Sequence, residues 1–226
     1  MERGYVLHHR PYRESSALVN LLVDGKGRVD AVARVGSGKR SIKSILQPFQ
    51  PVIFTLSGAS ELKKMAQIEA ASPAIPLANQ SLYAGMYLNE LLVKVVSSYH
   101  QAELFQAYHQ TLLSLASEFK QSHLRYFEYQ LLLQLGAMPS IEFDTQGDEI
   151  QQDALYRLLP EQGFMLTLNP HRAIQGDSLI ALTKQQINEH NELDLKNLMR
   201  TLLTPLLGNK PLLSRKLFTQ YIKHKC

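Results

Sequence analysis

Hydrophobic side chains occupy every second position through most of the first 72 residues, the pattern of β-strands that bury one face. The segment RVDAVARV (28–35) alternates in this way, and SALVNLLVD (16–24) does so before it. Asp24-Gly25-Lys26-Gly27 between them is a hairpin signal. The remaining candidate strands are GYVLHHR (4–10), PVIFTLS (51–57) and LKKMAQIEA (62–70). The pattern therefore predicts a small β-rich domain.

Five short strands in such a short segment are typical of the five-stranded Greek-key barrel called the oligonucleotide-binding (OB) fold. Small alanines on the inward face of segment 28–35 suit a crowded barrel interior. A second assignment stays open at this point. Leu62, Met65 and Ala66 also fit helical spacing, so a three-stranded sheet followed by a helix at 60–71 is the alternative.

Proline-rich PAIPLANQ (73–80) marks the expected boundary between an OB domain at 1–76 and a second domain at 77–226. Beyond it, apolar residues recur every three or four positions and predict helices at 81–99, 101–119 and 122–135. Gly136 and Pro139 provide the stop signals for the third helix. The second domain is therefore predicted to be mainly helical.

Residues 140–176 lose the helical period and gain glycines and prolines, which predicts a small irregular insertion with short strands such as GFMLTL (163–168). Helical spacing returns from Ser178, with a long helix near 193–207 capped by Gly208 and a last helix from Ser214. The whole chain is thus expected to be α+β: a barrel followed by a mainly helical domain.

Charge is distributed unevenly along the chain. The net charge is +4, but residues 1–72 carry +5, residues 73–176 carry −5 and residues 177–226 carry +4. Two basic ends around an acidic middle suggest surfaces that face an anion. No apolar run approaches the roughly 18 residues of a membrane helix, and the first residues lack a signal peptide. The expected location is cytoplasmic and nucleoid-associated.

The stretch ARVGSGKRSIKSILQPF (33–49) concentrates Arg34, Lys39, Arg40 and Lys43 around a glycine-rich tip. Guanidinium and ammonium groups suit phosphate oxygens, and glycines let the backbone bend. A nucleotide-hydrolysing phosphate loop is excluded, because Arg40 stands where the motif requires serine or threonine after Gly-Lys. The stretch is interpreted as a basic loop over the barrel that binds a nucleic-acid backbone.

Five phrases resemble the RecO family of bacterial recombination mediators, in order and at similar spacing over nearly the whole chain. They are VLHHRPYRESS (6–16), KRSIKSILQPFQP (39–51), LYAGMYLNELL (82–92), LRYFEYQLL (124–132) and GNKPLLSRKLF (208–218). The resemblance implies an N-terminal OB barrel, a helical domain and often a four-cysteine zinc module. Residues 140–176 contain no cysteine, and Cys226 is the single cysteine of the chain. We therefore expect no metal and no other cofactor.

The resemblance also implies what the protein does. It would bind single- and double-stranded DNA, anneal complementary strands, and help load a recombinase onto strands coated with single-stranded DNA-binding protein. The implied partners are that protein, RecR and, indirectly, RecA. No enzymatic turnover beyond strand annealing is expected. The eight histidines form no metal-binding motif, and no Gly-x-Ser-x-Gly elbow occurs.

The candidate DNA-binding residues are the cations that the barrel groups together and the cations near the C-terminus. Those of the barrel are Arg10, Arg13, Arg28, Arg34, Lys39, Arg40 and Lys43. Those near the C-terminus are Lys210, Arg215 and Lys216. Bases stack on aromatic rings, and Tyr12 and Phe49 are candidates, although Phe49 could instead plug the end of the barrel. A mediator that pairs two strands needs to hold both, and two basic regions would permit that.

In the RecO family the helical domain receives the acidic, phenylalanine-ended tail of single-stranded DNA-binding protein. The resemblance makes Arg125 the candidate clamp for the terminal carboxylate, with Lys94 and Lys120 as weaker candidates. The alternative for Arg125 is a helical ion pair with Glu128 three positions along.

Two other functions remain open from the residues alone. One is a general nucleic-acid chaperone whose barrel acts on RNA. The other is a non-catalytic adaptor whose helical domain binds proteins while the barrel is inert.

Overall fold

The computed structural model describes residues 1–36, 41–98, 101–209, 211–215 and 217. It divides into two compact units. The first comprises Met1–Phe119 with the described part of Asn209–Cys226, and the second comprises Lys120–Gly208. The sequence domains 1–76 and 77–226 stay a prediction.

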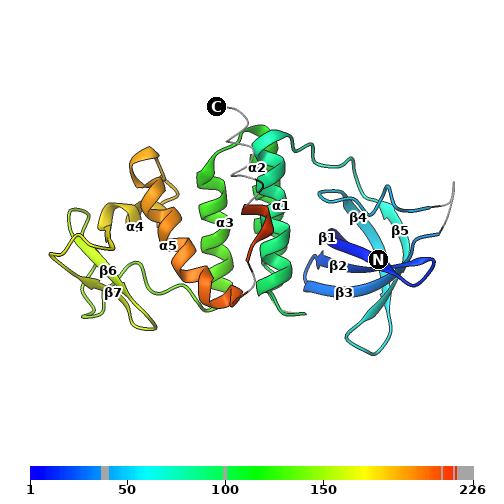
Figure 1. Ribbon diagram of the computed structural model, residues 1–226, viewed down its shortest axis with the longest axis horizontal. Coiled ribbons are helices and arrows are strands. Elements are labelled where there is room, and N and C mark those ends of the chain that lie inside the picture. The colour runs from blue at the N-terminus through cyan, green and yellow to red at the C-terminus, as the bar shows by residue number, and fades with distance from the viewer. Residues whose placement is uncertain (37–40, 99–100, 210, 216, 218–226) are drawn as a thin grey trace. The chain divides into compact units, whose positions relative to one another are not determined.

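The first unit contains a closed five-stranded barrel with the order β1-β2-β3-β5-β4 (Figure 1). Its strands are β1 (Glu2–Tyr12), β2 (Ser16–Val23), β3 (Gly27–Arg34), β4 (Pro51–Ser57) and β5 (Lys63–Ala70). β5 pairs parallel to β3 and antiparallel to β4, which closes the barrel. The predicted barrel is confirmed, and the alternative helix at 60–71 is wrong.

The barrel core follows the alternation seen in the sequence. Val29, Ala31 and Ala33 are fully buried on β3, while Asp30 and Val32 between them remain partly exposed. Fully burying an aliphatic side chain stabilises a fold by about 1.5–3 kcal/mol, so these strands hold their register through the buried face.

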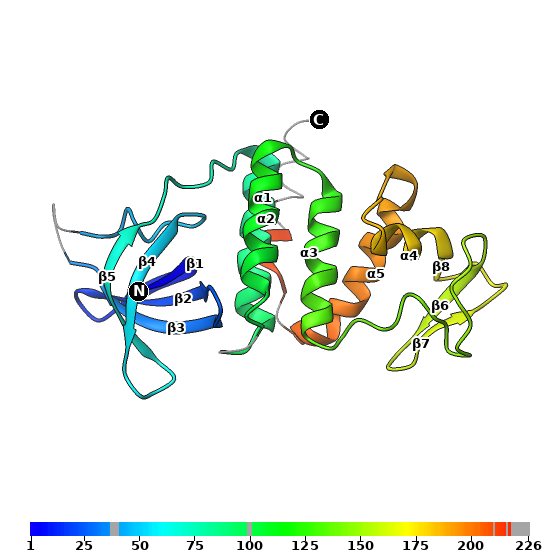
Figure 2. The same ribbon diagram turned by 180° about the vertical axis from the view of Figure 1, so that it is seen from behind.

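Two helices, α1 (Asn79–Val95) and α2 (Leu104–Ser117), belong to the same unit as the barrel (Figure 2). Tyr5 of β1 forms a hydrogen bond with Nδ1 of His109 at 2.6 Å, and its ring meets Tyr108 edge-on. Asn89 of α1 donates to the carbonyl oxygen of Leu7 at 3.0 Å. These contacts fasten the first strand to both helices.

Close packing at Gly85 also joins α1 to the segments beside the barrel. A Cβ at this position would lie 2.6 Å from the side chain of Leu77 and 2.7 Å from the ring of Phe49. Phe49 has a left-handed backbone conformation with φ of 63° and is 5% exposed. Its ring therefore packs beside α1 at Gly85, and the two sequence interpretations of Phe49, a ring that stacks on bases or a plug at the end of the barrel, stay predictions.

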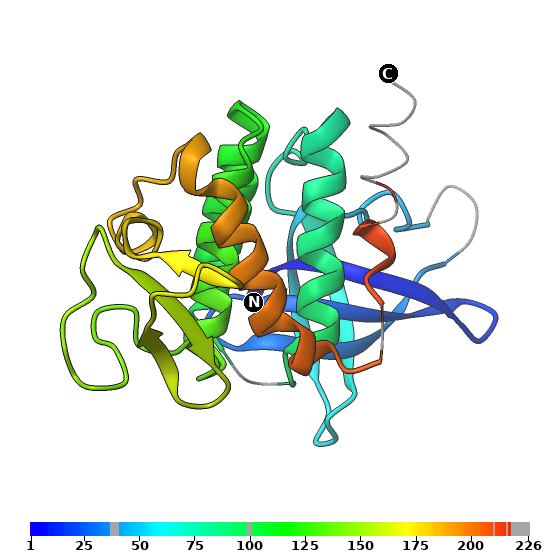
Figure 3. The ribbon, with the colours of Figure 1, turned by 60° about the vertical axis from the view of Figure 1, so that its left-hand side comes forward.

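The second unit combines helices with a small sheet. Its helices are α3 (Gln121–Gln134), α4 (Gly176–Thr183) and α5 (Glu189–Leu207). The predicted insertion contains the sheet β7-β6-β8, formed by β6 (Leu155–Leu159), β7 (Gly163–Leu166) and β8 (Ala173–Gln175). α5 packs beside β8 (Figure 3).

Helix α5 begins four residues earlier than its predicted start at 193. Asn188 forms a capping box with Asn191. The Asn188 side chain accepts a hydrogen bond from a backbone N–H of the first turn, and the Asn191 side chain accepts one from the backbone N–H of Asn188. This cap satisfies donors that the first turn would leave unpaired, and so it fixes the start of the helix. Among the described helices, none combines the length and the apolar composition needed to cross a membrane.

Candidate nucleic-acid interface

Strand pairing brings cations from β1 and β5 onto one outward row of the barrel. Arg10 pairs with Leu18, Leu18 with Val32, and Val32 with Lys64. Directly paired residues point to the same face of a sheet, and the two end members of the row are exposed while the two apolar members are half-buried. At about 4.8 Å per strand, the row extends roughly 14 Å around the barrel.

A second row lies two residues further along the strands. Tyr12 pairs with Ser16, and Ser16 pairs with Arg34. Arg13, which follows at the β1–β2 turn with φ of 57°, places its guanidinium 5.2 Å from the centre of the Tyr12 ring. Tyr12 is half-buried and Arg34 exposed. This row adds cations and one aromatic ring to the same end of the sheet.

We call Arg10, Tyr12, Arg13, Arg34 and Lys64 the outer basic face. Among the described residues, Arg10, Arg34 and Lys64 have no ion-pair partner. Their charges are therefore available to phosphate oxygens in solution. The two half-buried aliphatic residues between Arg10 and Lys64 give the face an apolar centre that bases could contact.

Lys64 was missed by the sequence analysis. Lys63-Lys64 opens β5, which is a visible charge pair in the sequence, but its place beside β1 cations depends on the parallel β3–β5 pairing. This pairing places Arg10 and Lys64, which are 54 positions apart in the sequence, in the same row.

The basic loop is described in part. Lys39 and Arg40 lie outside the described residues, and Lys43 is exposed after them. Burial lowers the pKa of His9 on β1, and the positive charges of His8 and Lys43 lower it further. Lys43 is therefore close enough to β1 for its charge to act on that strand.

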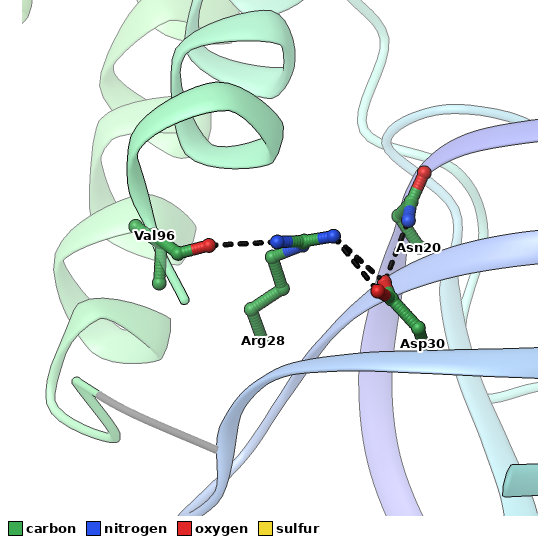
Figure 4. Close-up of polar contacts among 4 residues, drawn as sticks. All are labelled: Asn20, Arg28, Asp30 and Val96. Atoms are coloured by element: carbon green, nitrogen blue, oxygen red, sulfur yellow. Dashed lines mark hydrogen bonds and ion pairs between the residues drawn. The ribbon is translucent and has the colours of Figure 1, made fainter. Parts of the chain in front are cut away.

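Arg28 differs from the other barrel cations because its guanidinium is engaged within the protein (Figure 4). It donates to the carbonyl oxygen of Val96, just after α1, at 2.8 Å and to both carboxylate oxygens of Asp30 at 2.9 Å. Asn20 donates to the same carboxylate at 2.6 Å. The geometry gives Arg28 a role in joining β3 to the end of α1, and its contact with DNA stays a prediction.

The C-terminal cations are only partly described. Lys210 and Lys216 lie outside the described residues. Arg215 places its guanidinium 5.9 Å from the centre of the Tyr87 ring on α1. As a second DNA surface, this group stays a prediction.

Of the residues expected to receive a partner peptide, Arg125 and Lys120 lie in the second unit and Lys94 lies in the first. Arg125 and Glu128 form a buried ion pair at 2.8 Å, with side chains 8% and 1% exposed. Lys94 pairs with Glu90 at 2.7 Å in the first unit, and Lys120 is exposed at the start of α3. The pairing with Glu128 occupies Arg125, so a carboxylate ligand would have to compete for its guanidinium.

Among the described residues, no group of three or more histidine, cysteine, aspartate and glutamate side chains is arranged to hold a metal ion.

The chain is similar to one family of proteins along nearly its whole length. The model "Recombination protein O N terminal" matches residues 1–74, and "Recombination protein O C terminal" matches residues 80–216. The DNA repair protein RecO of Pasteurella multocida is 38% identical over 99% of this chain and 96% of its own length. That of Pseudoalteromonas atlantica is 39% identical over 96% and 93%, and that of Yersinia pestis 37% over 98% and 95%.

Two family models that together match nearly the whole chain agree with the resemblance drawn from its five phrases. The barrel and the helical remainder with its small sheet are the two parts that those models divide between them. The chain therefore belongs to the RecO family of DNA repair proteins, which are non-catalytic recombination mediators.

Proposed function

We propose that this protein binds single- and double-stranded DNA through the outer basic face of its barrel and anneals complementary strands. The observation that carries the proposal is the pair of rows across β1, β2, β3 and β5, which gather Arg10, Arg13, Arg34 and Lys64 on one face. None of these four cations has an ion-pair partner within the described part of the chain. Neutralising phosphates on each strand lowers their mutual repulsion, and base pairing supplies the driving force for annealing.

Contacts on this face are with the backbone more than with base edges. Arginine and lysine side chains dominate it, and Tyr12 is its one aromatic ring. Phosphate contacts position a strand without reading its sequence. We therefore expect binding with little sequence preference and a strong dependence on salt.

Family membership supports the partners that the resemblance implied. These are single-stranded DNA-binding protein through its acidic tail, RecR, and indirectly the RecA recombinase that is to be loaded. In this proposal the protein acts on DNA coated with single-stranded DNA-binding protein, and the barrel supplies the contact with the strand.

The test is a full-length variant with Arg10→Gln, Arg34→Gln and Lys64→Gln. Each phosphate contact on single strands contributes about 0.7 to the slope of log affinity against log salt concentration, so the slope should flatten by about 2. The assay is fluorescence anisotropy of a labelled oligothymidine from low to high salt. Parallel titrations with single-stranded RNA distinguish a DNA mediator from an RNA chaperone.

A matched control removes the same charge elsewhere by Lys26→Gln, Lys184→Gln and Lys196→Gln. Lys26 lies in the turn at the other end of the β2–β3 hairpin, and the other two lie in the second unit. The control should keep the wild-type slope. Equal slopes for the two variants would remove the outer basic face from the DNA site.

A further inference from the structure

The second unit contains a cleft of about 930 Å³ between the small sheet and α5. From the sheet it is lined by Arg157 of β6 and by the turn that carries His171 and Arg172. From the helix it is lined by Asp194, Asn197, Leu198 and Thr201, which recur at the three- and four-residue intervals of one helical face, and by Arg200 beside them. The volume is at the upper end of the range for ligand sites in proteins.

Three guanidinium groups line this cleft, and none is neutralised within the described part of the chain. Arg157, Arg172 and Arg200 have no hydrogen-bond or ion-pair partner for their side chains among the described residues. The Nε atom of Arg157 is buried as well as unpartnered.

The turn that presents His171 and Arg172 is held in place by its own hydrogen bonds. The N–H of Asn169 donates to Oγ1 of Thr167 at 3.2 Å, and the N–H of His171 donates to Oδ1 of Asn169 at 2.9 Å. Arg172 has a left-handed backbone with φ of 57°, and the N–H of Ala173 closes the turn onto Pro170. The wall of the cleft is thus ordered before any ligand binds, which reduces the entropic cost of binding.

We propose that this cleft is a second binding site for single-stranded nucleic acid, separate from the outer basic face. The arginines would hold phosphate oxygens through paired N–H donors. The imidazole ring of His171 and the leucines of β6 offer flat and apolar surfaces to bases.

The polar lining favours a nucleic acid over an acidic peptide. The amides of Asn169 and Asn197 each carry both donors and acceptors, which base edges require and carboxylates do not. Asp194 in the same cleft can accept a hydrogen bond from a base amino group, a donor that acidic side chains do not carry.

This inference rests on the proposed function and extends it, because a protein that anneals two strands must hold both. The barrel would hold one strand and the cleft the other. The cleft would replace the C-terminal cations as the second basic region that the sequence analysis called for. Arg157 and Arg172 were not among the sequence candidates, because only the packing of the small sheet and its turn beside α5 brings them together with Arg200.

The experiment uses the full-length chain and oligothymidine in which some thymines are replaced by the photoreactive base 5-iodouracil. Crosslinked peptides are identified by mass spectrometry for the wild type, a barrel variant (Arg10→Gln, Arg34→Gln, Lys64→Gln) and a cleft variant (Arg157→Gln, Arg172→Gln, Arg200→Gln). The wild type should give crosslinks in β1–β3 and in residues 164–175. Each variant should lose its own crosslinks and keep those of the other site.

Affinity is measured in the barrel-variant background, where the outer basic face has lost three of its four cations. Adding the three cleft substitutions should weaken oligonucleotide binding by at least about tenfold, since each removes a charged hydrogen-bonding group. Lys184→Gln with Lys196→Gln, two changes in the same unit outside the cleft lining, should leave it unchanged. If the triple change unfolds the unit, Arg172→Gln with Arg200→Gln keeps Arg157 and tests the same site.

The outcomes separate the two proposals. Crosslinks at the barrel alone in the wild type and in the cleft variant, with full oligonucleotide binding by the cleft variant, overturn the second site and leave the barrel site standing. Crosslinks only in the cleft overturn the barrel site. If the cleft variant loses affinity for a decaglutamate peptide while its oligonucleotide binding is unchanged, the cleft is a protein-binding site and this inference is wrong.

Discussion

Glu90 of α1 holds the C-terminal residues 211–215 against that helix, and its replacement by glutamine should loosen them. Its carboxylate accepts hydrogen bonds from the backbone N–H groups of Leu213 and Ser214, at 2.9 and 2.8 Å, and from the Ser214 hydroxyl at 2.7 Å. Lys94 pairs with the same carboxylate at 2.7 Å and donates to the carbonyl oxygen of Pro211. One acidic side chain thereby anchors two consecutive amides of the segment.

The magnitude follows from the pKa of Glu90. Burial by itself would raise this pKa, but the hydrogen bonds from Lys94, Ser214 and Leu213 outweigh burial and lower it from 4.5 to about 2. At about 1.36 kcal/mol per pKa unit, the shift corresponds to roughly 3 kcal/mol at most. Because the side chain keeps some contact with solvent, screening reduces the expected contribution to about 1–2 kcal/mol.

The sign of the pH dependence is fixed by the lowered pKa. The ionised carboxylate contributes its full stabilisation above pH 4.5, and this contribution is lost as the pH falls toward 2. The difference in free energy of unfolding between wild type and Glu90→Gln should therefore be about 1–2 kcal/mol at pH 7 and should shrink below pH 4.5.

The assay combines urea unfolding from pH 7 to pH 3 with amide hydrogen exchange. Glu90→Gln should accelerate amide exchange at Leu213 and Ser214, because the N–H groups of both residues donate hydrogen bonds to the Glu90 carboxylate. Glu61→Gln, at an exposed position with no side-chain partner among the described residues, is the control. A stability difference that stays constant across this pH range, or unchanged exchange at both amides, would refute the reasoning.

Two further predictions concern packing and charge. Gly85→Ala should destabilise the protein by about 1–3 kcal/mol in urea unfolding, although alanine favours helices, because its Cβ would overlap Leu77 and Phe49; an unchanged midpoint would contradict this packing. Arg125→Met alone should lower the free energy of unfolding by about 3–5 kcal/mol, because it leaves Glu128 charged and buried. Adding Glu128→Leu should restore most of this stability, and equal stabilities of the single and double variants would contradict a buried ion pair.

Local pattern was sufficient for most elements of the fold. The alternation at 28–35 predicted β3 and its buried face, because a strand places every second side chain in the core whatever the rest of the chain does. Helical periodicity with Gly136 placed the end of α3, and Gly136 does adopt a left-handed backbone with φ of 65°. The sequence left open whether residues 60–71 form a helix or a strand, because their short apolar spacing fits both. The strand forms because it pairs with β3 and β4.

The grouping of charges was decided by tertiary structure. The sequence identified Arg10, Arg28 and Arg34 as equivalent candidates, but the fold turns Arg28 toward Val96, 68 positions away, and leaves the other two outward. It also sets Lys64 in the same row as Arg10. Partners so distant in sequence leave no periodic signal.

The sequence by itself determined the family, the alternating strands at 16–24 and 28–35 and the succession of helices, because these depend on local periodicity and on phrases of neighbouring residues. The barrel was closed only by the pairing of β5 with β3 and β4. Only the tertiary structure decided which cations share a surface and which are paired within the protein. It also formed the cleft of Arg157, Arg172 and Arg200, since β6, a turn and α5 meet there from separate parts of the chain. Electrostatic surfaces depend on distances in space, and strand pairing and helix packing set those distances.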